Sequence, residues 1–137
     1  MYVQIDLAFT LSDLSLADFA RRDYSGPPLK SLVEIIEYIK PTALLGLSTT
    51  KGAFTKEVVE SMTRLNPRPI IFPLSNPVSL SECEFHEAVE WTDGKVIFAS
   101  GSPFPMCNYK GKEYWPGQGN NMWVFDSPHG SMANRVS

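Results

Sequence analysis

Three stretches of helical periodicity, each followed by a short apolar run, constrain this chain more than any other feature of its sequence. Apolar residues recur at helical spacing over residues 29–40, over residues 54–65 and again up to about Trp91. The short apolar runs span residues 42–47, 70–74 and 96–99. Such runs, apolar on both faces, are typical of strands inside a parallel sheet that has helices above and below it. The alternation therefore predicts an α/β fold with a parallel sheet and right-handed crossovers.

The expected start of the third helix rests on two overlapping capping-box patterns. Ser79 is followed three residues later by Glu82, and Ser81 in the same way by Glu84. After residue 99 the regularity stops. The segment 100–119 is predicted to be a loop rich in Gly and Pro, with a small hairpin that pairs residues 108–109 with 114–115. A further helix is predicted to begin near residue 119.

Composition bounds the class of protein. The chain has 137 residues, of which 43% are hydrophobic and 20% charged, as expected for one globular domain. Its net charge is −3 and its largest basic cluster is the pair Arg21 and Arg22, so no nucleic-acid partner is expected. The apolar runs fall far short of the ~20 residues of a membrane helix, so no membrane partner is expected.

Compartment is predicted from the first residues and from the cysteines. Asp6 and Asp13 lie within the first 16 residues, which have no basic region, so no secretory signal peptide is expected. The two cysteines form neither a disulfide framework nor a four-ligand zinc site. An intracellular location, in the cytoplasm or the mitochondrion, is therefore predicted.

Small polar loops follow all three predicted strands, at residues 46–52, 75–77 and 100–103. The carboxyl ends of parallel strands meet at one edge of the sheet, where ligands of such folds bind. The alternative is that these residues serve only as turns. The first loop is not a phosphate-binding P-loop, because Lys51 precedes Gly52 instead of following it.

Amide side chains are the remaining candidates for a site. Asn76 ends a predicted strand, and Asn120 and Asn121 open the last predicted helix. An amide offers both an acceptor and donors without a charge. The alternative is that these asparagines are turn and N-cap residues. His86 and His129 lack partners at metal-ligand spacing, and neither a metal ligand nor a catalytic side chain is identified.

Four strings of the sequence, in this order and spacing, resemble malic enzyme. They are PTALLGLS at 41–48, IIFPLSNP at 70–77, FASGSPF at 98–104 and PGQGNN at 116–121. The resemblance covers residues 17–125 and corresponds to the second half of the family's NAD(P)-binding domain. Residues 1–16 stay unassigned, and residues 126–137 are expected to be an unrelated, disordered tail. The fold implied is a partial Rossmann-like parallel sheet with helices on both faces, truncated at both ends.

The resemblance also implies chemistry. Malic enzymes are homo-oligomeric oxidoreductases that convert L-malate to pyruvate and CO2 with NAD or NADP and a divalent Mg or Mn ion. By the same resemblance, Asn76, Asn120 and Asn121 are expected to contact substrate. Gly46, Ser48, Asn76 and Asn120 are expected to contact the cofactor.

Several parts of the family's machinery have no counterpart in this sequence. They are the glycine-rich fingerprint, the tyrosine general acid, the lysine general base and the carboxylates that hold the metal. Two alternatives therefore stay open beside a malic enzyme segment. One is a non-catalytic fragment or inactive paralogue that acts as a binding or interaction module. The other is a free-standing module that holds a small carboxylate with its three asparagines.

Overall fold

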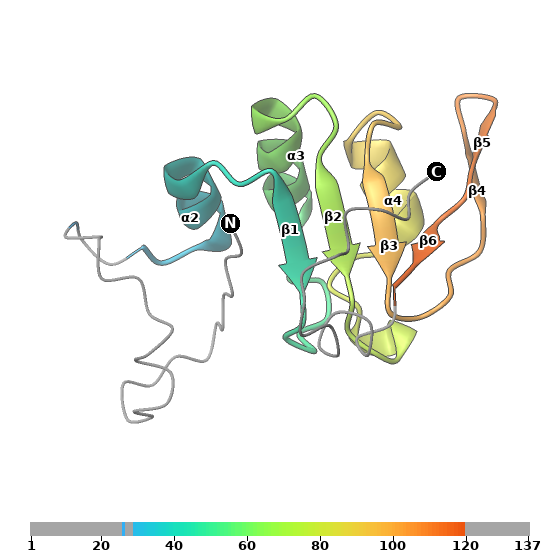
Figure 1. Ribbon diagram of the computed structural model, residues 1–137, viewed down its shortest axis with the longest axis horizontal. Coiled ribbons are helices and arrows are strands. Elements are labelled where there is room, and N and C mark those ends of the chain that lie inside the picture. Colours follow the sequence, from blue (N-terminus) through green and yellow to red (C-terminus); the bar gives the residue numbers. More distant parts are fainter. Residues whose placement is uncertain (1–25, 27–28, 120–137) are drawn as a thin grey trace, which may run out of the picture.

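A computed structural model describes residue 26 and residues 29–119 (Figure 1). The elements in chain order are α2 (Leu32–Ile39), β1 (Ala43–Gly46), α3 (Lys56–Leu65), β2 (Ile70–Pro73), the 3-10 helix η1 (Val78–Leu80), α4 (Phe85–Trp91), β3 (Ile97–Ser100), β4 (Cys107–Tyr109), β5 (Lys112–Tyr114) and β6 (Gly117–Gln118).

The sheet is parallel, with the strand order β1-β2-β3-β6. Ile70 of β2 lies opposite both Ala43 of β1 and Ile97 of β3, so the three main strands run in near register. Helices α3 and α4 connect these strands in turn. The predicted α/β class and partial Rossmann-like parallel sheet are confirmed.

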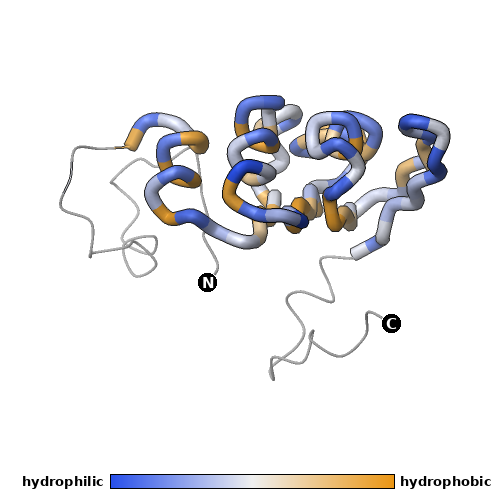
Figure 2. Tube along the Cα trace, turned by 90° about the horizontal axis from the view of Figure 1, so that it is seen from above, coloured by the Kyte–Doolittle hydropathy of each residue, from blue (hydrophilic) through white to orange (hydrophobic). Residues whose placement is uncertain are grey.

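Helices α3 and α4 cover the same face of the sheet, and α2 packs beside α3 at the β1 edge (Figure 2). Strand order follows chain order from β1 to β3, and crossovers of one hand then place α3 and α4 on one side. Residues on the two faces alternate between buried and half-buried in all three strands. Helices on both faces were predicted because the strands are apolar on both faces. Within the described residues, the second helical layer is not found.

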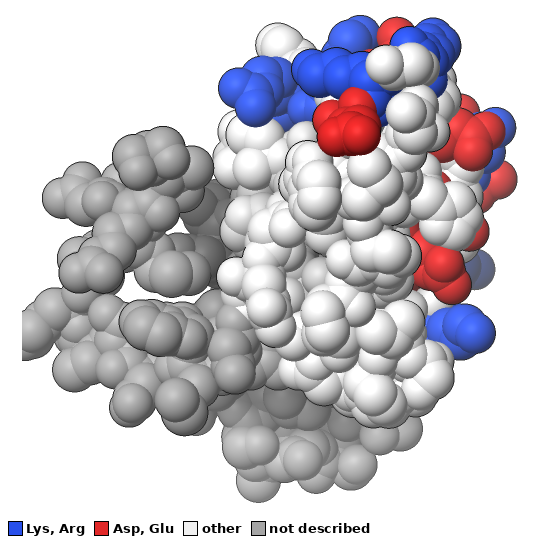
Figure 3. Space-filling view, turned by 90° about the vertical axis from the view of Figure 1, so that its right-hand side faces the viewer, with Lys and Arg blue, Asp and Glu red and all other residues white. Residues whose placement is uncertain are grey.

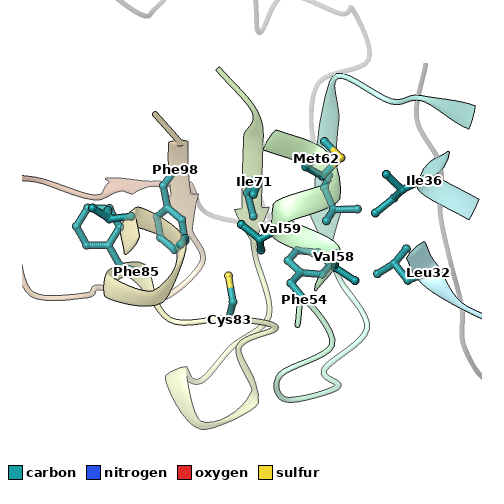
Figure 4. Close-up of a cluster of buried hydrophobic side chains, with 13 residues drawn as sticks. Leu32, Ile36, Phe54, Val58, Val59, Met62, Ile71, Cys83, Phe85 and Phe98 are labelled. Carbon is teal, nitrogen blue, oxygen red and sulfur yellow. The ribbon is translucent and has the colours of Figure 1, made fainter. Parts of the chain in front are cut away.

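The core lies between this single helical layer and the sheet (Figure 4). It is built from buried residues of every main element: Leu32, Ile36, Leu44, Phe54, Val58, Val59, Met62, Ile71, Cys83, Phe85, Ala88, Val89 and Phe98. The Phe98 ring packs 5.0 Å from that of Phe85 and meets Phe104 edge-on at 6.1 Å between centroids. Each fully buried Val, Leu, Ile, Phe or Met side chain of this core contributes about 1.5–3 kcal/mol relative to exposure.

The first helix begins and ends with clear local signals. Ser31 caps α2, its side chain accepting from the backbone N–H of Glu34, whose carboxylate accepts in turn from the Ser31 N–H. Lys40 ends the helix in the left-handed conformation, directly before Pro41.

The predicted start of the third helix is wrong. Residues 78–80 form only the 3-10 turn, and α4 begins at Phe85, capped by Glu84 and Glu87. Ser81 instead donates from Oγ to the carbonyl of Cys83 at 2.8 Å. Neither predicted capping box forms. The carboxylate of Glu82 is buried in the protein interior, and Glu84 is itself the N-cap of α4 instead of the partner of Ser81.

The region after β3 contains the predicted hairpin and one strand that was not predicted. Strands β4 and β5 pair Cys107 with Tyr114 and Tyr109 with Lys112, a slightly different register from the one expected. The turn residues Lys110 and Gly111 both have positive φ, as two-residue hairpin turns of the primed type require. Strand β6 then adds to the edge of the sheet beside β3. In the described part of the chain, no helix has the length and apolar character needed to cross a bilayer.

Candidate functional site

The three loops predicted to form a site do meet at one edge of the sheet, at the lower end of the strands in Figure 1. Two hydrogen bonds connect them. The backbone N–H of Thr49, after β1, donates to Ser75 Oγ, after β2, at 2.9 Å. Ser102 Oγ, after β3, donates to Asn76 Oδ1, after β2, at 2.5 Å. The loops therefore form one continuous surface.

Asn76 is exposed at this edge, but its carboxamide is held at both ends. Its Oδ1 accepts from Ser102, and its Nδ2 donates to the carbonyl of Leu74 at 3.4 Å. The peptide bond between Asn76 and Pro77 is cis. Ser102 is itself buried, and its carbonyl accepts from Ser100 Oγ at 2.7 Å.

Gly101 lets the turn after β3 approach the end of β2. A Cβ atom at this position would lie 2.2 Å from the Leu74 carbonyl oxygen and 2.8 Å from Asn76 Nδ2. The first of these neighbours is backbone and cannot rotate away. The close contact between the two strand ends, and with it the Ser102–Asn76 hydrogen bond, therefore requires glycine here.

A buried carboxylate joins the first two loops, and sequence reasoning missed its role. Glu82 is fully buried, and its Oε1 accepts three hydrogen bonds, from the Ser48 N–H at 3.1 Å, from Ser48 Oγ at 3.3 Å and from Ser75 Oγ at 2.5 Å. Its Oε2 is buried without a hydrogen bond. The available signal, a Ser–x–x–Glu pattern, pointed to a helix cap instead.

Gly46 and Ser48, the two predicted cofactor residues of the first loop, both depend on Glu82. A Cβ at Gly46 would lie 2.4 Å from Glu82 Cδ, so this buried glycine leaves room for the carboxylate. Ser48 is half-buried and held by Glu82 through both its backbone and its hydroxyl. Gly46 thus shapes the loop from within.

Asn120 and Asn121 lie outside the described residues. The chain before them is placed at the same edge, since β6 pairs with the end of β3 and the Gly119 N–H donates to the Ser100 carbonyl at 2.9 Å. Asn76 and Ser48 are brought together at this edge, and the two other predicted asparagines follow directly on Gly119.

Figure 3 shows a cluster of Lys and Arg side chains at the hairpin end of the view and several acidic side chains along its right-hand side, with a further basic side chain lower on that side. The first loop of the carboxyl edge also carries a charge, on the exposed Lys51. Among the described residues, no group of three His, Cys, Asp or Glu side chains could hold a metal ion. His86 is exposed beside Glu84, with Nδ1 3.4 Å from Oε2. Cys83 is a core residue, and burial, followed by the charges of nearby glutamates, raises the pKa of its thiol.

A parallel α/β sheet with small, hydrogen-bonded polar loops at its carboxyl edge places the chain in the class of open α/β domains, whose ligands bind at that edge. Comparison with known proteins narrows this class to one family. The family described as "Malic enzyme, NAD binding domain" matches residues 12–131, and the chain belongs to it.

Individual relatives are similar over most of this chain. The NADP-dependent malic enzyme of Dictyostelium discoideum is 52% identical over 107 residues, which cover 78% of this chain and 20% of that protein. The chloroplastic NADP-dependent malic enzyme of Zea mays and the NADP-dependent malic enzyme of Populus trichocarpa are each 52% identical over 98 residues. Those 98 residues cover 72% of this chain and 15% and 17% of the two plant proteins. The chain thus spans about a fifth or less of the length of these relatives.

Proposed function

We propose that this chain supplies part of the NAD(P) and L-malate site of a malic enzyme. The observation that carries the proposal is the pair of hydrogen bonds, Thr49 to Ser75 and Ser102 to Asn76, that joins three strand ends into one edge. This edge presents the exposed amide of Asn76, and the exposed Lys51 belongs to its first loop. Ligands of parallel α/β sheets bind at this edge.

Within this site, each predicted residue has a role. Asn76 hydrogen-bonds the substrate and the nicotinamide end of the cofactor. Asn120 and Asn121 hold the nicotinamide ribose or carboxamide and the malate carboxylate. The Ser48 loop passes beside the nicotinamide, and Gly46 leaves room for the glutamate that fixes that loop.

The reaction proposed for the assembled enzyme is the oxidative decarboxylation of L-malate to pyruvate and CO2 with NAD or NADP. In malic enzymes a divalent Mg or Mn ion takes part. The described residues of this chain do not fit that ion, because no group of acidic, histidine or cysteine side chains among them could hold it. Homo-oligomeric assembly and an intracellular location, in the cytoplasm or the mitochondrion, also stay predictions.

Calorimetric titration of the purified chain with NADP and with NAD tests the proposal. We expect binding of at least one cofactor in the millimolar range or tighter. Asn76→Ala removes one hydrogen bond and should weaken binding about 2- to 10-fold. Asn108→Ala is the matched control, because this exposed asparagine lies in the hairpin strand β4. With malate, cofactor and Mn²⁺, the chain alone should produce no reduced cofactor, since it provides no identified acid, base or metal ligand.

If the chain binds neither NADP nor NAD, the proposal is contradicted. This result would favour the second candidate, a non-catalytic interaction module.

A further inference from the structure

Ser102 is buried after β3 and donates a hydrogen bond to the exposed amide of Asn76. We propose that Ser102 is a positioning residue that turns the Asn76 carboxamide so that its NH2 group faces the ligand. The site would then recognise an oxygen acceptor, either the carboxylate of the hydroxyacid or the carboxamide oxygen of the nicotinamide. This inference rests on the proposed function and specifies the chemistry of its central residue.

The two ends of the Asn76 amide are distinguished by their neighbours. The carbonyl oxygen of Leu74 can only accept, so the end of the amide that faces it at 3.4 Å is Nδ2. The opposite orientation would place two acceptors against each other. The Ser102 hydroxyl then meets Oδ1 at 2.5 Å and donates to it. The Leu74 carbonyl selects this orientation, and the Ser102 hydroxyl, which can donate or accept, supplies the donor that Oδ1 then needs.

Ser102 can impose this orientation because it is itself fixed and removed from water. It is 8% exposed, whereas Asn76 is exposed. A buried hydroxyl must use its donor within the protein, since an unsatisfied polar group in the interior is costly. The buried Ser100 holds the Ser102 carbonyl at 2.7 Å, and Gly101 keeps the turn against the end of β2. Hydrogen bonds thus connect the buried Ser100 to Ser102, and Ser102 to the exposed amide of Asn76.

Asn76 has one N–H hydrogen left to donate to a ligand. Its Oδ1 is occupied by Ser102, and Leu74 takes one of the two Nδ2 hydrogens over a long contact. Within the described residues, the other Nδ2 hydrogen has no acceptor. A ligand that binds there must therefore present an oxygen with a free lone pair.

The test compares N76D with the wild type and with N108D, which makes the same change of charge on the exposed hairpin. The probes are L-malate alone and NADP alone, titrated into the full chain. N76D keeps an acceptor for Ser102 but replaces the NH2 group by a negatively charged oxygen. We expect N76D to weaken binding at least 10-fold for each probe that presents its oxygen to Asn76, and N108D to leave binding unchanged.

A second variant reports on orientation directly. S102A should weaken the same probe about 2- to 10-fold, the loss expected for one hydrogen bond. It should also shift the side-chain NH2 signals of Asn76 in a ¹H–¹⁵N correlation spectrum of the free chain. A merely structural role of Ser102 would lower thermal stability without moving these signals specifically. S102T, which keeps the hydroxyl, should retain the wild-type signals.

The outcomes are distinct. Loss of malate binding alone in N76D identifies the carboxylate as the acceptor, loss of NADP binding alone identifies the carboxamide oxygen, and loss of both identifies both. Unchanged affinity of N76D for both probes overturns the inference and the role proposed for Asn76, whereas cofactor binding by the wild-type chain would still support a site at this edge. A wild-type chain that binds neither probe overturns the proposed function and this inference with it. If N76D does not fold, S102A with unchanged affinities and unchanged Asn76 signals overturns the inference.

Discussion

Polar side chains are used in opposite ways at the two ends of the sheet. At the carboxyl ends of the strands, buried side chains make hydrogen bonds, Ser75 to Glu82 and Ser102 to Asn76. At the other end, where the hairpin lies beside the start of β3, polar side chains form the exposed pair Lys110 and Asp93, with side chains 69% and 55% exposed. Buried hydrogen bonds fix the positions of the loops at the carboxyl end, whereas the hairpin end is a solvated surface.

The difference follows from solvent. In the interior, a hydrogen bond cannot be replaced by water, so losing one partner leaves the other unsatisfied. On the surface, water and salt replace a lost ion pair at little cost. Substitutions should therefore have large effects at the carboxyl edge and small effects at the hairpin end.

Gly101→Ala should have the largest effect. Its Cβ would lie 2.2 Å from the Leu74 carbonyl oxygen, so the ends of β2 and β3 must separate. We expect a loss of about 3 kcal/mol in the free energy of unfolding, the upper part of the range for overpacking. Urea denaturation followed by circular dichroism measures it. Gly119→Ala is the control, because the nearest atom there is 3.4 Å away, an ordinary contact. Equal stability of the two variants would show that the strand ends are not held this close.

Glu82→Ala should have the next largest effect. It leaves the Ser48 N–H and the Ser75 hydroxyl without their acceptor and opens a void beside Gly46. We expect a loss of about 2–3 kcal/mol in the free energy of unfolding, from the unsatisfied groups together with the cavity. Glu82→Gln keeps one carbonyl oxygen and should lose less.

The control for Glu82 is Glu90→Ala, a change of the same kind at an exposed position of α4, expected to stay within about 0.5 kcal/mol of the wild type. If Glu82→Ala were as mild as this control, the carboxylate would not join the loops after β1 and β2.

The sequence predicted the features of the fold that local residue patterns determine. The periodicity of residues 29–40 and 54–65 located α2 and α3, and the parallel order of the strands placed Asn76 at the ligand edge. These features depend on neighbours in the chain and on the general rule for strand ends.

The features that sequence did not predict depend on contacts between distant residues. The pattern Ser79–Glu82 is typical of a capping box, and nothing in the local sequence distinguishes a capping glutamate from a buried one. Only the folded structure, in which Glu82 accepts from Ser75 in the interior, shows that Glu82 is buried. Strand β6, Gly117–Gln118, has no apolar pattern and is a strand only because β3 offers it an open edge. The position of α3 and α4 on one face likewise follows from strand order, which apolar runs do not encode.

Lys110→Gln, at the hairpin end, should have the smallest effect of these substitutions. The hydrogen bond from Lys110 and its charge, with a smaller contribution from the Tyr109 hydroxyl, lower the pKa of Asp93. A lowered carboxyl pKa stabilises the fold above the ordinary pKa, and this contribution is lost as the pH falls through the lowered value. The variant should therefore raise the Asp93 pKa toward its ordinary value, with no resolvable change in unfolding at neutral pH, because both side chains are exposed. An NMR titration of the Asp93 carboxyl carbon measures the shift.

Lys112→Gln is the control, since Lys112 lies over the Tyr114 ring at 5.1 Å instead of pairing with Asp93. A destabilisation by Lys110→Gln as large as that of Glu82→Ala would mean that the hairpin end, too, is held by its polar contacts.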